Sequence, residues 1–206
     1  NMKYYINNKK GFTLIEIVVV IGILAVIAIA IGAFQTDVFK NNKFSMDSLN
    51  TTQDARSIIA TMVKELRSAS PGSNGSFTIL QAATNTITFF SDVDGDVLKE
   101  QIRYYLATTT LKKGVIKPTG NPPTYNGANE TFYYLAYNIR NSSTTPVFEY
   151  YDSNYMGTSS PLTQPVTTTQ IKLVKINLMI DVDPNKAPVI KNYTSQVSIR
   201  NLKDNL

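Results

Sequence analysis

The residue most in need of a chemical explanation is Glu16, which places a carboxylate at the start of a long apolar run. Residues 17–34 contain no charged side chain. At about 1.5 Å per residue, a helix of this length approaches the ~30 Å thickness of a bilayer's hydrocarbon core. A carboxylate costs roughly 2–3 kcal/mol or more in lipid, so Glu16 needs either a partner or a position at the membrane surface. Both interpretations stay open from this residue alone.

A second candidate site consists of Asp92, Asp94 and Asp96. Clustered carboxylates favour hard cations such as calcium, but this spacing does not match an EF-hand loop. Asp94-Gly95 is also a strong signal for a two-residue hairpin turn, in which alternate residues point to opposite faces. A turn without a ligand is therefore the favoured interpretation, and a calcium site is the alternative. No other metal or cofactor is expected.

The composition excludes much of catalysis. The chain contains no Cys and no His, which excludes disulfides, thiolate chemistry, the usual zinc sites and a Ser-His-Asp triad. No nucleophile–base set or Gly-rich phosphate loop is found, so we expect no catalytic residues and no enzyme. The net charge is +5, but Lys3, Lys9 and Lys10 precede Gly11, and nucleic-acid binding is not indicated.

The apolar run continues into an amphipathic helix. We expect one helix from Phe12 to Ala69, with a transmembrane half over 12–35 and an amphipathic half over 36–70. Ser70-Pro71-Gly72 ends it, and Glu65 lies off the apolar stripe. The stripe, which indicates packing against a sheet, is formed at helical spacing by Ala55, Ile58, Ile59, Met62, Val63 and Leu66.

Residues 71–206 show short β runs between turn residues, which predicts an antiparallel β head and an α+β fold. A bulge or bend is expected at Gly114, and residues 118–146 resemble an insertion that carries one strand. The expected strands are 77–80, 86–90, 101–106, 110–117, 132–137, 147–151, 171–182 and 197–200.

The basic residues Lys9 and Lys10 stand directly before the apolar run, with no acid upstream. The positive-inside rule therefore predicts a single-pass protein with a cytoplasmic N-terminus and an exported head. A cleavable secretory signal, cut near Ala28-Ile29-Ala30, is the less favoured alternative, because the apolar run is long and Glu16 interrupts it.

The run from Lys9 to Glu16, KKGFTLIE, resembles the prepilin signal of type IV pilins and type II secretion pseudopilins. The resemblance implies a pilin-like fold and a leader, residues 1–11, removed by a prepilin peptidase between Gly11 and Phe12. It also implies methylation of the new Phe12 amine. Glu16, the fifth residue of the mature chain, would pair with the Phe12 amine of its own or a neighbouring subunit during assembly.

The layout of the head is similar to the J-type pseudopilin and the W-type minor pilin, through segments 92–96, 103–106, 148–152 and 198–201. This implies a minor subunit that primes or caps a filament. Its partners would be other pilins, the prepilin peptidase and an assembly platform with an ATPase. It would be stored in the bacterial cytoplasmic membrane and then join a filament at the cell surface or in the periplasm. The alternatives are a filament-tip binding pilin for adhesion or DNA uptake, and an unrelated single-span surface protein.

Overall fold

A computed structural model describes residues 11–184 and 189–202 of the chain. Its first element is the helix α1 (Leu14–Arg67), 54 residues long, which confirms the expected helix to within two residues at each end. The chain divides into two compact units, residues 1–46 and residues 47–206, and α1 contributes to both.

In the first unit, α1 is apolar on every side over residues 17–34. The large apolar side chains between Leu14 and Phe34 are all about half exposed or more. The helix is long and apolar enough to cross a membrane, and it lies near the N-terminus. A helix with this surface needs lipid or other apolar helices around it, because a water-soluble helix carries polar residues on one face.

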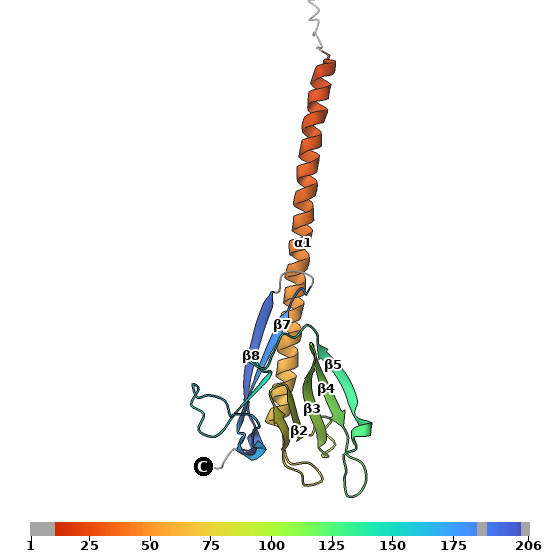
Figure 1. Ribbon diagram of the computed structural model, residues 1–206. Coiled ribbons are helices and arrows are strands. Elements are labelled where there is room, and N and C mark those ends of the chain that lie inside the picture. Colours follow the sequence, from red (N-terminus) through yellow and green to blue (C-terminus); the bar gives the residue numbers. More distant parts are fainter. Residues whose placement is uncertain (1–10, 185–188, 203–206) are drawn as a thin grey trace, which may run out of the picture. The chain divides into compact units, whose positions relative to one another are not determined.

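In the second unit, the C-terminal part of α1 packs into the core of the head (Figure 1). The buried residues of the helix include four members of the expected stripe, Ala55, Ile59, Met62 and Leu66. These side chains form one cluster with the inward residues of both sheets described below. The predicted amphipathic packing of the helix against a sheet is thus confirmed.

The larger sheet has five antiparallel strands in sequence order, each paired with the next. This order follows from short connections, which keep consecutive strands adjacent. Its inward face carries alternating residues such as Ile102 and Tyr104 of the third strand, both almost fully buried. The strands are β1 (Ile79–Ala83), β2 (Thr86–Ser91), β3 (Glu100–Ala107), β4 (Thr110–Ile116) and β5 (Thr131–Ala136).

The smaller sheet has three antiparallel strands, β6 (Phe148–Tyr151), β7 (Leu173–Asp181) and β8 (Ile190–Ser198). The amide of Phe148 donates to the carbonyl of Thr84, and the Tyr150 hydroxyl donates to the carbonyl of Ala83. These bonds connect the smaller sheet to the β1–β2 end of the larger one. Short 3-10 helices lie at Gly127–Asn129, Thr168–Gln170 and Arg200–Leu202.

Four local expectations are wrong. Ser91 pairs with Glu100, so residues 92–99 form a long connection and not a two-residue hairpin at Asp94-Gly95. No bulge occurs at Gly114 in its pairing with β3. The last strand begins at Ile190, well before the expected residue 197, because its alternation is mostly polar. Glu65 is only 8% exposed.

Two of these differences have a visible cause. A Cβ atom on Gly114 would lie 1.8 Å from Oε1 of Glu130, so the glycine leaves room for that side chain. Glu130 accepts two hydrogen bonds from Arg103, at 2.9 and 2.7 Å. Glu65 accepts from the Tyr104 hydroxyl and from Nζ of Lys113, which satisfies its carboxylate inside the head.

Candidate functional site

The predicted cleavage site precedes the first turn of α1. Gly11, Phe12 and Thr13 are not helical, and Phe12 is 78% exposed. A Cβ atom on Gly11 would meet no atom within 4 Å, and its backbone does not adopt the left-handed conformation. Neither packing nor backbone conformation in this chain therefore explains a glycine here. Recognition by another molecule is a consistent reason, because an enzyme can approach a glycine backbone closely.

Glu16 and Thr13 form a reciprocal cap at the helix N-terminus. The amide of Thr13 donates to Oε2 of Glu16 at 3.4 Å, and the amide of Glu16 donates to Oγ1 of Thr13 at 3.3 Å. This arrangement is a capping box, which satisfies two of the amides that a helix start leaves unpaired. Sequence reasoning missed this local role, although the spacing Thr-x-x-Glu is its known signal.

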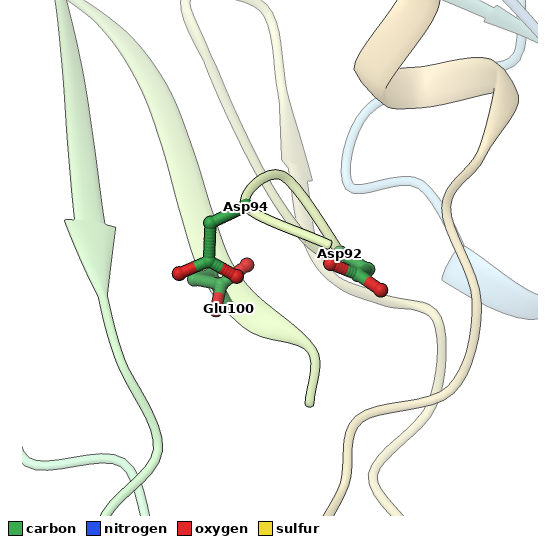
Figure 2. Close-up of side chains that lie close together, drawn as sticks. All are labelled: Asp92, Asp94 and Glu100. Carbon is green, nitrogen blue, oxygen red and sulfur yellow. The ribbon is translucent and has the colours of Figure 1, made fainter. Parts of the chain in front are cut away.

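A group of acidic side chains lies at the β2–β3 connection. Figure 2 shows Asp94 beside Glu100, with Asp92 across the loop from them. One carboxylate oxygen from each of the three residues lies within 4.8 Å of the other two. In the described ranges, 11–184 and 189–202, this is the one group of three or more acidic side chains close enough to share a metal ion.

Glu100 is the unusual member of this group, because its side chain has no exposed surface. Its Oε2 accepts a hydrogen bond from the amide of Val93 at 3.0 Å, whereas its Oε1 is buried without any hydrogen-bond partner. Burial raises the pKa of Glu100, and the charge of Asp94 raises it further. A buried carboxylate with an unpaired oxygen is energetically costly.

Two lysines balance the outer carboxylates. Nζ of Lys117 donates to Oδ2 of Asp94 at 2.5 Å, and this hydrogen bond lowers the pKa of Asp94 and raises that of Lys117. Nζ of Lys99 lies 3.5 Å from Oδ2 of Asp92. The Lys117 side chain is 67% exposed, so its ion pair is weak and open to exchange.

Of the three aspartates in the alternative calcium interpretation, the structure brings Asp92 and Asp94 together. Asp96 instead accepts a hydrogen bond from the amide of Leu98 at 3.0 Å. The third member of the cluster is Glu100. A sequence signal for Glu100 exists: it shares the inward face of β3 with Ile102 and Tyr104. A charged residue at a buried position of an alternating strand indicates a polar site.

The remaining site residues stay predictions. Lys9 and Lys10 lie outside the described residues. The structure places Gly11 and Phe12 in an accessible, non-helical position, and it brings Glu16 next to Thr13. Cleavage, methylation and assembly each require a second molecule.

One comparison with known protein families concerns the N-terminal segment. A family model described as "Prokaryotic N-terminal methylation motif" matches residues 6–32, which include the glycine, the exposed Phe12 and the capping carboxylate described above. No curated protein matches the chain.

Proposed function

Because the chain carries the type IV pilin-like signal over residues 6–32, we propose that it is a minor pilin or pseudopilin. It is a structural subunit, not an enzyme, and it primes or caps a type IV pilus or a type II secretion pseudopilus. The methylation-motif match carries this proposal. The fold supports it, since a long apolar N-terminal helix continues into an antiparallel β head.

Processing follows from the position of the signal. A prepilin peptidase cuts between Gly11 and Phe12 and methylates the new Phe12 amine. The exposed, non-helical backbone at this bond supports cleavage without unwinding of α1. Lys9 and Lys10 hold the leader, residues 1–11, on the cytoplasmic side of the membrane. Because the cut precedes the apolar run, the mature chain keeps its anchor.

Glu16 then sets the register of assembly. Once the leader is removed, Phe12 carries an ammonium group four residues before the Glu16 carboxylate. Among packed apolar helices, an unpaired carboxylate is costly, so Glu16 pairs with the Phe12 amine of its own or a neighbouring subunit. The exposed apolar surface of residues 14–34 provides the contact area for those helices.

The cellular route follows from the same elements. The subunit is stored in the bacterial cytoplasmic membrane as a single-pass protein, with residues 12–35 in the bilayer and the head, residues 71–206, exported. Residues 36–70 continue the anchor helix, and their second half packs in the core of the head. An assembly platform with an ATPase then moves the subunit into a filament of other pilins, in the periplasm or on the cell surface. The layout of the head, which resembles the J-type pseudopilin and W-type minor pilin, supports a minor role.

Substitution at the cap tests the proposal with a matched control. Glu16→Gln keeps an acceptor for the Thr13 amide but removes the charge, whereas Thr13→Val removes a cap acceptor and keeps the charge. We expect Glu16→Gln to reach the membrane and be processed normally. Its recovery in sheared filaments should fall about tenfold or more, because a buried charge pair is lost. Thr13→Val should assemble like the wild type.

Two results would contradict this role of Glu16. Normal incorporation of Glu16→Gln would make the helix a plain anchor, as in an unrelated single-span surface protein. Loss of Thr13→Val together with normal incorporation of Glu16→Gln would assign Glu16 to helix capping alone, because Gln keeps the cap acceptor. Processing is measured separately by mass, so a defect in cleavage is distinguished from a defect in assembly.

Binding at the filament tip is a second candidate function, favoured by exposed aromatic side chains. Phe132, Tyr133 and Tyr134 of β5 and the nearby Tyr137 are each about half exposed or more. Exposed aromatics are common at binding surfaces. If residues 118–146 bind a surface or DNA, then Phe132→Ser with Tyr134→Ser should reduce adhesion or DNA uptake while filament number stays unchanged. Unchanged binding by normally assembled filaments would exclude this function for the segment.

A further inference from the structure

We propose that Asp92, Asp94 and Glu100 form a binding site for a divalent cation, specifically calcium, at the β2–β3 connection of the head. The site goes beyond the proposed filament role and does not depend on it, because all three ligands lie within the second unit. Figure 2 shows the three carboxylates at the loop that joins the two strands.

The buried oxygen of Glu100 is the observation that points to a ligand. Glu100 has no exposed surface, and its Oε1 has no hydrogen-bond partner. Buried polar atoms in folded proteins are almost always satisfied, so an unpaired carboxylate oxygen indicates a missing partner. Lys99 and Lys117 neutralise Asp92 and Asp94, but no described hydrogen-bond donor reaches Oε1 of Glu100.

The spacing of the oxygens fits calcium. Two oxygens that bind one calcium ion at 2.3–2.6 Å lie at most about 4.6–5.2 Å apart, whereas the corresponding limit for magnesium is about 4.0–4.2 Å. The three ligand oxygens lie within 4.8 Å of one another. A calcium ion therefore fits between them with small movements, and magnesium requires the loop to contract further.

The surrounding charges set the expected affinity. Lys117 competes with a cation for Asp94, and its 67% exposed side chain can move into solvent when the cation binds. With two carboxylates on a largely exposed connection and the third buried at the start of β3, we expect a dissociation constant of roughly 10⁻⁴–10⁻³ M, the range of extracellular calcium modules. Bound calcium would tie the 92–99 connection to the first residue of β3.

The test uses the full chain in detergent and compares thermal unfolding in CaCl₂, in MgCl₂ and in EDTA at matched ionic strength. We expect saturable stabilisation by calcium, with magnesium clearly weaker. Glu100→Gln should abolish the calcium response and should unfold in EDTA no earlier than the wild type, because it removes the buried charge. Asp94→Asn is a second ligand variant should Glu100→Gln fail to fold.

Asp96→Asn is the matched control, since it removes the same charge from the same connection but lies outside the cluster. It should keep the calcium response to within about twofold, and Lys117→Gln should bind calcium more tightly because a competitor is gone. The proposal is overturned if the wild type shows no calcium-specific stabilisation. It is also overturned if Asp96→Asn loses as much of the response as Asp94→Asn or Glu100→Gln.

Discussion

Glu65 connects α1 to the larger sheet through two buried polar contacts, and Glu65→Ala is expected to destabilise the head by about 3 kcal/mol. The hydroxyl of Tyr104 donates to one carboxylate oxygen of Glu65 at 2.5 Å. Nζ of Lys113 donates to the other, also at 2.5 Å. The side chains of Lys113 and Glu65 are 13% and 10% exposed, so water replaces these contacts poorly.

The magnitude follows from what alanine leaves behind. Removing one partner of a fully buried ion pair costs about 3–5 kcal/mol, and a hydrogen bond to a charged group contributes about 1.5–3 kcal/mol. Lys113 keeps some exposure and a flexible stem, which places the cost at the lower end of the first range. Replacing both charges and the donor hydroxyl, with Glu65→Met, Lys113→Met and Tyr104→Phe together, should cost about 1 kcal/mol or less, because no partner of this hydrogen-bonded group is then left unpaired.

The assay is denaturant unfolding of the full chain in detergent. Because the chain contains no Trp, near-ultraviolet circular dichroism from Tyr and Phe reports the tertiary structure of the head. A double-mutant cycle over Glu65 and Lys113 should give a coupling energy above about 1 kcal/mol. Two results would refute the idea that this pair holds the helix to the sheet. One is that the destabilising effects of the two single substitutions add to within about 0.5 kcal/mol. The other is that Glu65→Ala lowers the free energy of unfolding by less than about 0.5 kcal/mol.

Two further predictions concern the sheets. Gly114→Ala should lower the free energy of unfolding by about 1–2 kcal/mol, because its Cβ would displace Glu130 from Arg103. In a Glu130→Ala background, denaturant unfolding should show that the same substitution costs less than about 0.5 kcal/mol. An equal cost in both backgrounds would contradict this cause. Burial raises the pKa of Tyr150 above its ordinary value of 10.0, so above pH 10 the unfolded chain releases a proton that the folded chain keeps. Above pH 10, this residue should therefore lower the free energy of unfolding by up to about 1.4 kcal/mol per pH unit. Denaturant unfolding of Tyr150→Phe should show a shallower decline with pH than the wild type. An unchanged slope would exclude a contribution from Tyr150.

Most of the regular elements, though not β8, were predictable because their signals are local. A continuous apolar run and a stripe at helical spacing predict α1 over nearly its full length. Strands β2, β3 and β7 follow from alternating β-branched and aromatic residues, and their bounds agree with the expected ones to within two residues. The match to the methylation motif likewise covers a contiguous segment, residues 6–32.

The contacts that complete the sites were not predictable, because their partners lie far apart in sequence. Because Glu65 lies off the apolar stripe, its burial could not be predicted from the helix alone. Its hydrogen bonds come from Tyr104 and Lys113, which belong to two different strands. Glu100 enters the acidic cluster only because Ser91 pairs with it and leaves residues 92–99 as a long connection. The dipeptide Asp94-Gly95 suggested a tight hairpin, but the strand register decides the length of the connection.

The central claim is that the chain is processed as a pilin-type precursor, and the most direct test is the intact mass and N-terminal sequence of the protein recovered from bacterial membranes. We expect a chain that begins at Phe12 and carries one methyl group on its amine. A chain that begins after Ala30 would contradict it and would make residues up to Ala30 an ordinary secretory signal. A chain that still carries Lys9-Lys10-Gly11 beside an active prepilin peptidase would contradict it equally.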